Sequence, residues 1–208
     1  MNESELHKKL PITAIVMTFN ETRNLKTCLE SVHEHIDQII IVDCFSTDDT
    51  IEIAKSFGCD IYQNKWINYS QQYLWASRET NIRNEWLLRL DADERWTKEG
   101  FKELSDIISS NEYDGIYVKM KIYFMDRWIK HGGFYPNDFL RVYKKSKGQM
   151  EDRWMDEHIK VEGKTIISGI DVIEANYDRQ QNITLWTTKH NGYSTREAVE
   201  FLQQVPVE

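Results

Sequence analysis

The stretch WLLRLDADERW, residues 86–96, joins an apolar run to a cluster of acids. Its first half, WLLRL, has the composition of a strand that is buried in a parallel sheet. Asp91, Asp93 and Glu94 follow at once, so that three carboxylates lie within four positions. Carboxylates that are gathered in one partly buried place repel one another, and this raises the pKa of some of them. The stretch therefore predicts a bound cation, or acid chemistry, at the end of a strand.

The chain before this stretch alternates between strand and helix patterns. Continuous apolar runs predict buried strands over residues 12–18, 38–43, 59–63 and 85–91. One face of a helix is predicted from five apolar residues between the first two runs: Leu25, Cys28, Leu29, Val32 and Ile36. A second helix is expected to have Ser46 or Thr47 as its N-cap and to end near Gly58, and a third to cover about residues 70–81. This alternation is typical of right-handed βαβ units, and it predicts a parallel sheet.

The pattern changes after Asp114. Residues 115–124 and 138–145 alternate between apolar and polar side chains, which predicts strands, and a turn at Gly132–Gly133 lies between them. A helix capped by Thr97 is expected to come before these strands. This part of the chain therefore predicts a mixed β region beside the parallel sheet.

The last predicted elements are helices from Ile183 onward. We expect a break near Gly192, because the residues Ser194–Glu197, STRE, have the form of a capping box. Together the patterns predict a single domain over residues 1–208 and an α/β fold. Its Rossmann-like, mostly parallel sheet is flanked by helices and is followed by the mixed β region and the C-terminal helices.

Composition narrows the class of protein. The chain has 208 residues, of which 40% are hydrophobic and 29% are charged, and this suits a globular domain with a sizeable core. The net charge of −8 argues against nucleic acid as a partner, because phosphate binding needs basic surfaces. One group of basic residues could still face a phosphate or a membrane surface, or form a solvated face: Lys119, Lys121, Arg127, Lys130, Arg141, Lys144, Lys145 and Lys147.

The expected compartment is reducing. Cys28, Cys44 and Cys59 are odd in number and lack metal-site spacing, so we expect no disulfide framework. The apolar run near the N-terminus is too short for a signal peptide, and no run reaches the roughly 18 residues of a membrane span. We therefore expect a cytoplasmic protein, with peripheral contact at the inner face of the cell membrane as an option.

Polar residues follow the predicted parallel strands, where ligands bind in open α/β sheets. They are Thr18, Asn20 and Glu21 after the first strand, Asp43 after the second, and Asp91, Asp93 and Glu94 after the fourth. Such a crevice would gather at least four carboxylates. A hard divalent ion such as Mg²⁺ or Mn²⁺ would relieve their repulsion, because it takes oxygen ligands and keeps phosphate oxygens in its shell. The alternative for Asp91 and Asp93 alone is a capped surface turn.

No glycine-rich phosphate loop follows the first strand, since neither G-x-x-x-x-G-K-[ST] nor G-x-G-x-x-G occurs there. A diphosphate would then be held through the metal and a few basic side chains. The role of Glu94 stays open between facing a second substrate, supporting a metal ligand and pairing with Arg95.

Several motifs resemble one known family when they are taken in order. ITAIVMTFNE, IIIVDCFSTDDT and EWLLRLDADE are similar in order and spacing to inverting family 2 glycosyltransferases with the GT-A fold. HGGFYPNDFLRVYKK, RWMDEHIKVEG and KHNGYSTREA continue the resemblance, over roughly residues 11–202, to the subgroup that builds lipopolysaccharide core, capsule or other surface polysaccharide. The resemblance implies a nucleotide-binding half at about residues 11–115 and an acceptor-binding half at about 116–208.

The resemblance implies roles for the residues at the strand ends. Thr18, Asn20 and Glu21 would line the nucleotide pocket, and Asp43 would accept hydrogen bonds from the uracil or its ribose. Asp91 would face the ribose or a metal-bound water. Asp93 would bind the metal, Mn²⁺ or Mg²⁺, which acts as a Lewis acid on the departing diphosphate.

The resemblance also implies a carboxylate general base in the segment WMDEHI. Glu157 is favoured and Asp156 comes second, with an exposed helix start as the alternative for both. His158 is expected to be orienting or structural. His190 would lie where relatives close a C-terminal segment over the diphosphate, as a metal ligand or simply as a packed histidine. Arg141 would contact phosphate or acceptor, and a strand-face salt bridge is the equal alternative.

The partners implied are a UDP-linked sugar donor and a glycan or lipid-linked acceptor. Departures from relatives at Tyr73, Leu74, Met120 and Asp126 leave the sugar undetermined. Relatives often continue into further C-terminal helices, so a C-terminally truncated sequence is expected. The alternatives are a sugar-phosphate nucleotidyltransferase and a non-catalytic nucleotide-sugar-binding protein. The former would need a basic, glycine-rich loop after the first strand, and MTFNETRN lacks one.

Overall fold

The first half of the chain alternates strands and helices, as the sequence predicts. The structure is a computed structural model that describes residues 9–154, 157–177 and 182–204. The elements of the first half are β1 (Leu10–Thr18), α1 (Leu25–Val32), β2 (Ile36–Asp43), α2 (Thr50–Ser56), β3 (Asp60–Gln63), α3 (Tyr69–Glu79) and β4 (Trp86–Asp91). β1 lies between β2 and β4, β3 pairs with the other edge of β2, and all four strands are parallel.

The second half extends this sheet with strands of both directions. Its elements are β5 (Glu94–Trp96), α4 (Lys98–Ser110), β6 (Gly115–Phe124), β7 (Arg127–Trp128), β8 (Asp138–Lys144), β9 (Gly148–Met150), β10 (Ile159–Val161), β11 (Thr165–Glu174) and α5 (Ile183–Gln204). β8 lies antiparallel between β4 and β6, β11 is parallel to β6, and β5 is antiparallel to β11. The order is β3-β2-β1-β4-β8-β6-β11-β5, with β7 beside β6, while β9 and β10 form a separate pair. The predicted mixed region is confirmed.

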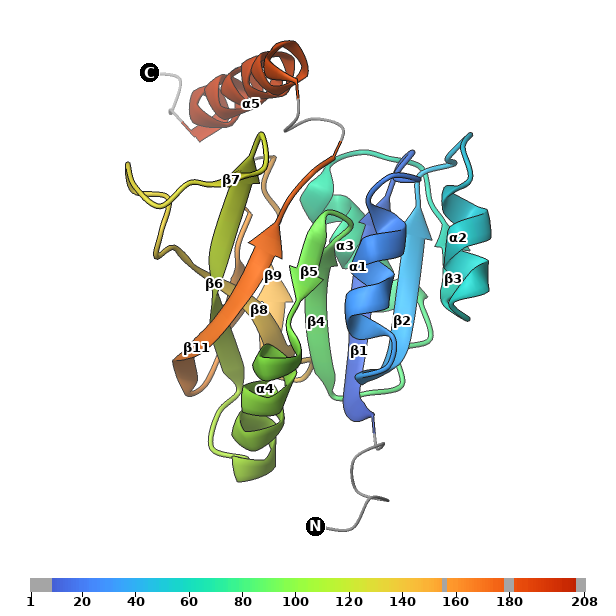
Figure 1. Cartoon of the computed structure of the whole chain (residues 1–208), viewed down its shortest axis with the longest axis vertical. Coiled ribbons are helices and arrows are strands. Elements are labelled where there is room, and N and C mark those ends of the chain that lie inside the picture. Colours follow the sequence, from blue (N-terminus) through green and yellow to red (C-terminus); the bar gives the residue numbers. More distant parts are fainter. Residues whose placement is uncertain (1–8, 155–156, 178–181, 205–208) are drawn as a thin grey trace.

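Helices cover both faces of the sheet (Figure 1). On β1, Ile12, Ala14 and Val16 face the core that lies under α1, α2 and α4, whereas Ile15 faces the core under α3. This alternation follows from the pleat, which points successive side chains to opposite faces. The buried face of α1 matches the prediction at four positions: Leu25, Cys28, Leu29 and Val32. The predicted arrangement, a sheet that is flanked by helices on both faces, is therefore confirmed.

Two predictions about helix ends were tested by the hydrogen bonds at the caps. Thr97 caps α4 as predicted, because its side chain accepts from the N–H of Gly100 at 3.0 Å. Ser46 and Thr47 do not cap α2, whose N-cap residue is Asp49. Both residues instead connect the loops after β1 and β2, since the Ser46 hydroxyl accepts from the N–H of Asn20 and the N–H of Thr47 donates to the side chain of Asn20.

Two further boundaries differ from the prediction. Ile36 begins β2 instead of continuing α1, because the chain turns at residues 33–35 and Leu10 pairs with Ile36. Helix α5 continues through Gly192 without a break. A glycine inside a helix costs about 1 kcal/mol relative to alanine. The Ser194 hydroxyl donates to the carbonyl oxygen of His190 at 3.1 Å, within the helix, instead of forming a new N-cap.

Helix α5 has a distinct place in the fold. Figure 1 shows it above the carboxyl ends of β6 and β11, on the edge of the sheet where the strands β1 and β4 also end. None of the described helices is long and apolar enough to cross a membrane. The helix thus covers the edge at which the polar residues predicted from the sequence are gathered.

Candidate functional site

The parallel strands bring three predicted site residues to one edge of the sheet. Thr18 is in register with Asp43 on β2, and its neighbour Met17 is in register with Asp91 on β4. The carboxyl ends of the three strands therefore lie side by side. This is the juxtaposition that the order of strands in the sequence predicts.

Asp43 is fully buried and its carboxylate is surrounded by donors. The Thr18 hydroxyl donates to Oδ1 at 3.0 Å, and Oδ2 accepts from the N–H of Ser46 at 2.8 Å and from Nε2 of Gln63 at 3.3 Å. The Ser46 hydroxyl donates to Oδ1 as well. In this structure Asp43 orders the loop after β2, and its contact with a nucleotide stays a prediction.

Hydrogen bonds hold the loop after β1 against the loop after β2. Asn20 adopts a left-handed conformation with φ of 54°, its N–H donates to the Ser46 hydroxyl at 2.8 Å, and its Oδ1 accepts from the N–H of Thr47 at 2.8 Å. The N–H of Glu21 donates to the Thr50 hydroxyl at 2.8 Å. Asparagine suits the position of residue 20, because it tolerates a positive φ better than most residues. Asn20 therefore shapes the loop.

A cavity of about 330 Å³ opens at this edge, and we name it the central cavity. It is lined by Met17, Glu21, Tyr69, Arg89, Asp91, Ala92, Asp93, Phe139, Arg141, Glu157, His158, Glu174, Lys189 and Tyr193. A second cavity of about 340 Å³, the side cavity, is lined by Met17, Thr18, Phe19, Glu21, Cys44, Trp66 and Tyr69. The two cavities share Met17, Glu21 and Tyr69. The two cavities therefore border each other.

Asp91 is held by two arginines. Nη2 of Arg141 lies 3.1 Å from its Oδ2, and Nε of Arg89 lies 3.9 Å from its Oδ1. Burial by itself would raise the pKa of Asp91, but the charges of Arg141 and Arg89 lower that pKa below its usual value. Asp91 is therefore a carboxylate at neutral pH, and it presents a hydrogen-bond acceptor to the cavity.

Glu94 is a buried partner of Arg141, and not of Arg95 as one of the predicted alternatives had it. Its side chain is 1% exposed, it is ion-paired to Arg141, and its Oε2 accepts from the N–H of Asp91 at 3.2 Å. Burial raises the pKa of Glu94, and Arg141 opposes that rise. Arg95 points elsewhere and donates to the carbonyl oxygen of Ala175 at 3.1 Å. Glu94 thus orients Arg141 and the end of β4. Two alternatives were predicted for Arg141, a salt bridge on the strand face and a contact with a ligand. The structure shows the salt bridge, and it also places Arg141 in the wall of the cavity.

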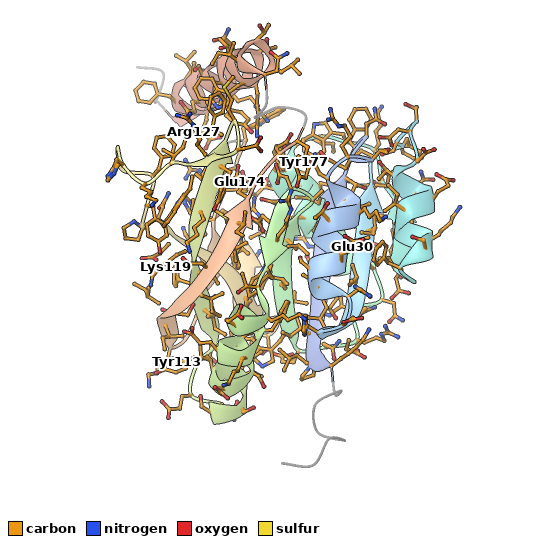
Figure 2. The ribbon with its side chains drawn as sticks, in the orientation of Figure 1. Glu30, Tyr113, Lys119, Arg127, Glu174 and Tyr177 are labelled. Carbon is orange, nitrogen blue, oxygen red and sulfur yellow. The ribbon has the colours of Figure 1, made fainter. Side chains whose placement is uncertain are left out.

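Asp93 lies in the turn between β4 and β5, next to the end of β11. Its Oδ2 accepts from Nδ2 of Asn176 at 2.9 Å, and its carbonyl oxygen accepts from the N–H of Ala175 at 3.1 Å. Glu174, the last residue of β11, lines the same cavity (Figure 2). Burial, followed by the negative charge of Asp93, raises the pKa of Glu174 to about 7. Sequence reasoning missed Glu174, because the end of β11 carries no acidic motif.

Glu157 is brought to the central cavity, 68 residues away in sequence from Arg89. Its Oε1 lies 3.0 Å from Nη2 of Arg89, and its side chain is 10% exposed. Asp156, the alternative base, lies outside the described residues. His158 lines the cavity but its side chain is mostly exposed, with Nδ1 3.5 Å from Glu151. Among the described residues of WMDEHI, Glu157 is therefore the carboxylate that faces the cavity.

Helix α5 contributes Lys189 and Tyr193 to the central cavity. Burial alone would lower the pKa of Lys189, but Tyr193 and the charges of Asp93 and Glu174 raise it. Lys189 was not among the site residues predicted from the sequence, although Lys189 directly precedes His190 in the motif KHNGY. The spacing Lys189–Tyr193, i to i+4, is the one signal that both side chains share a helical face.

His190 is not among the residues that line the central cavity. Its ring stacks on Trp186 with 3.8 Å between ring centroids, and Nδ1 lies 2.8 Å from the carbonyl oxygen of Trp186. It lines a different cavity, next to Phe124 and Phe134. The structure thus places the histidine on the packed side of α5, and its role as a metal ligand stays a prediction.

The described residues contain no group of three histidine, cysteine, aspartate or glutamate side chains that could hold a metal ion by themselves. Mg²⁺ is commonly bound by one or two carboxylates together with substrate phosphates and water. Asp93 fits that mode, because it is a cavity-lining carboxylate beside Glu174 and offers hard oxygen donors. The donor set thus fits a hard cation that arrives with a diphosphate.

Comparisons with known proteins agree with this fold and motif order. The family model described as Glycosyl transferase family 2 matches residues 13–165. The chain is 34% identical over 206 residues to an uncharacterized glycosyltransferase of Rickettsia felis, covering 93% of this chain and 71% of that protein. It is 29% identical over 149 residues to the lipopolysaccharide core biosynthesis glycosyltransferase LpsC of Rhizobium meliloti, covering 69% and 54%.

The fold also matches that of S. aureus TarS 1-349 in complex with UDP-GlcNAc. The TM-score is 0.57 at 14% identity, over 83% of this chain and 61% of that one. The chain spans about half the length of most of the relatives that it matches. The α/β sheet is therefore a GT-A fold, and the chain belongs to glycosyl transferase family 2.

Proposed function

We propose that this chain transfers a sugar, with inversion, from a UDP-sugar donor to a hydroxyl of a growing cell-surface glycan. The observation that carries the proposal is the central cavity, where Asp91 and Arg141 come from two strands, β4 and β8, and meet Asp93 and Glu157 from two connecting segments. The cavity contains a carboxylate that can take a proton, basic groups that can hold a diphosphate, and donors for a hard cation. Family membership supports the transferase reaction.

The nucleoside is proposed to occupy the side cavity. Trp66 and Tyr69 supply aromatic faces there, and Thr18 and Glu21 supply polar groups. Aromatic rings suit a flat base that stacks on them. TarS, which shares the fold, binds UDP and UDP-GlcNAc, and this favours uridine as the base. Asp43 supports the pocket from beneath through Thr18 and the loop after β2.

The diphosphate is proposed to lie in the central cavity between Arg141 and Lys189. A Mn²⁺ or Mg²⁺ ion held by Asp93 would neutralise the diphosphate as it departs. Arg141 is kept in place by Glu94, and Lys189 approaches from α5, so that the two cations lie on different elements around the cavity. His190 belongs to this proposal only as the sequence-based alternative for a metal ligand.

Glu157 is proposed as the general base. The acceptor oxygen attacks the anomeric carbon while the bond from that carbon to the diphosphate oxygen breaks, and the hydroxyl proton moves to Glu157. Arg89 keeps the carboxylate in position through the 3.0 Å ion pair. A base that activates the acceptor on the face opposite to the leaving group gives inversion at the anomeric carbon. Asp156 is the second candidate for this role.

The acceptor is proposed to be a cell-surface glycan precursor. The similarity to LpsC, a lipopolysaccharide core biosynthesis glycosyltransferase, supports this class. The predicted basic cluster is partly occupied by internal ion pairs, since Lys121 lies 2.6 Å from Asp171 and Lys144 lies 3.0 Å from Asp114. The location at the inner face of the membrane stays a prediction.

One experiment separates this function from its alternatives. Thermal unfolding is measured with UDP, with UTP and with a panel of UDP-sugars, each in the presence and absence of Mn²⁺. Stabilisation by UDP that requires Mn²⁺ is expected, and it should reach about 2.7 kcal/mol at a ligand concentration of 100 Kd. Release of UDP from one donor in the presence of an acceptor extract completes the test.

The other outcomes are distinct. A nucleotidyltransferase would be stabilised by UTP and would release pyrophosphate with a sugar phosphate. A non-catalytic binding protein would bind the nucleotide sugar without ever releasing UDP. Either result would contradict the proposed transfer.

A further inference from the structure

A third cavity lies between the upper part of β6 and α5, and we name it the apolar chamber. It has a volume of about 280 Å³ and is lined by Ile122, Phe124, Ile129, Phe134, Glu174, Ile183, Trp186, Lys189, His190 and Tyr193. Figure 1 shows α5 above the turn that joins β6 to β7, and Figure 2 shows Glu174 at the end of β11 on the same side. The end of β6, the loop after β7, the end of β11 and α5 together form its walls.

The chamber borders the central cavity. Glu174, Lys189 and Tyr193 line both cavities. A ligand that fills both would have a polar part near Glu157 and an apolar part near Phe124. The polar residues of the chamber lie along this shared boundary and on α5, and the rest of the wall is aliphatic or aromatic.

The walls of the chamber are unsuited to a sugar ring. A buried hydroxyl without a partner costs free energy, and Ile122, Phe124 and Ile129 offer no side-chain donor or acceptor. The Nδ1 atom of His190 is already engaged, because it lies 2.8 Å from the carbonyl oxygen of Trp186. Hydrocarbon suits these walls, because burying it from water is favourable.

The chamber is open to solvent at an apolar rim. Phe134 is 43% exposed and Ile183 is 54% exposed, although both also line the chamber. Met125, at the tip of the β6–β7 turn, is 45% exposed. A chain longer than the chamber could therefore leave it across an apolar surface.

We propose that the apolar chamber binds the hydrocarbon part of an amphiphilic acceptor, an isoprenyl or acyl chain that carries the hydroxyl or sugar to be glycosylated. This inference rests on the proposed function, because the residues shared with the central cavity give the chain its orientation. The polar head lies toward Glu157 and Lys189, and the chain lies against the apolar wall of Ile122, Phe124 and Ile129. The acceptor is thus lipid-linked, and its chain is recognised close to the reacting group.

The test uses alkyl glucosides as probes and reads binding by titration calorimetry. Methyl, hexyl and octyl β-glucoside are titrated below their micelle concentrations into the chain saturated with UDP and Mn²⁺. Affinity is expected to rise by up to about fourfold for each added methylene that enters the chamber. A flat series in protein that binds UDP overturns the inference but not the proposed function. Competition between octyl glucoside and UDP also overturns it, because the chamber would then hold the nucleotide.

Two variants locate the binding. Ile129→Trp fills the chamber, and Phe124→Ala removes part of its wall without filling it. Each is expected to weaken octyl glucoside binding at least tenfold and to leave UDP affinity within twofold. Ile167→Trp, at a 63% exposed position on β11 outside the chamber, is the matched control. Unchanged octyl glucoside affinity in Ile129→Trp that folds and binds UDP contradicts the inference. If the parent chain does not bind UDP, the proposed function fails, and the inference fails with it.

Discussion

Arg89 and Glu157 form an ion pair in the central cavity, with Nη2 of the arginine 3.0 Å from Oε1 of the glutamate. The two side chains are only 14% and 10% exposed. The same guanidinium lies 3.9 Å from Asp91 through its Nε atom. One arginine on β4 thus links the proposed base to the carboxylate at the end of its own strand. In the proposed mechanism, this pair sets the position of the carboxylate that would receive the proton of the acceptor hydroxyl.

The role of Glu157 is tested by Glu157→Gln. The amide keeps the shape but cannot take a proton, so the transfer rate should fall by about 10²–10⁴-fold. UDP affinity should stay within twofold, because the base acts on the acceptor. Steady-state UDP release and calorimetry with UDP and Mn²⁺ measure the two quantities.

A matched control is Glu162→Gln, which changes an exposed acid just after β10. It should leave both quantities unchanged. If Asp156→Asn abolishes transfer while Glu157→Gln does not, the base is Asp156 and the assignment made here is wrong.

Asp93 should be required for the Mn²⁺ dependence of UDP binding. Asp93→Asn removes the charge but keeps the hydrogen-bonding shape toward Asn176, so the fold should be preserved. The stabilisation of the chain by UDP should then no longer depend on Mn²⁺. Thermal unfolding with UDP over a Mn²⁺ series measures this. Asp106→Asn on the exposed side of α4 serves as control, and Mn²⁺ dependence that survives in Asp93→Asn would exclude Asp93 as the ligand.

Lys189 should contribute to diphosphate binding. A hydrogen bond to a charged group contributes roughly 1.5–3 kcal/mol, so Lys189→Met should weaken UDP binding by about 10- to 100-fold. Uridine, which lacks phosphate, should bind the variant as it binds the parent chain. Equal losses for UDP and uridine would point to a disturbed fold instead.

His190→Ala, measured beside Lys189→Met, compares the two neighbouring residues. The stacking of His190 on Trp186 predicts that UDP affinity changes little in His190→Ala. A loss of Mn²⁺ dependence in that variant would support the role that the sequence suggested for His190.

Arg141 should matter for stability as well as for binding. Its side chain is 8% exposed and pairs with Glu94, which is 1% exposed. Breaking a buried pair by removing one partner costs roughly 3–5 kcal/mol, because the other charge is left uncompensated. Arg141→Met should therefore lower the free energy of unfolding in urea by about that amount. The double variant Arg141→Met/Glu94→Gln should recover much of the loss, and no recovery would show that packing, not charge, is responsible.

The three thiols should be unreactive in the folded chain. Burial, followed by the charge of Asp43, raises the pKa of Cys44 to about 11, and burial raises the pKa of Cys59 to about 12. A raised pKa leaves less thiolate, so at pH 8 Cys44 should react with iodoacetamide about 200-fold more slowly than a free thiol of ordinary pKa. All three cysteines should react in urea. Rapid labelling of Cys44 in the native chain would contradict the buried setting of the loop after β2.

The parallel half of the fold could be predicted because its signals are local. Each apolar run before a polar strand end specifies a strand, and the helical face from Leu25 to Val32 specifies the helix between two of them. The two errors in helix capping arose where a serine forms a different hydrogen bond from the one that an N-cap requires. Ser46 has the chemistry of an N-cap, but the buried Asp43 carboxylate takes both of its donors. Ser194 has the form of a cap, but its hydroxyl bonds back within a continuous helix.

The sequence by itself determined the α/β class and the acids at the strand ends. The succession of strands and helices along the chain, and the hydrophobic period of each segment, are visible in neighbouring residues. It also pointed to Glu157 through a motif. Only the tertiary structure decided that Arg89 pairs with Glu157 and that Arg141 pairs with Glu94. It alone brought Lys189 and Glu174 to the same cavity. These relations join residues on different elements that are far apart in the sequence, and they depend on packing geometry that no local pattern encodes.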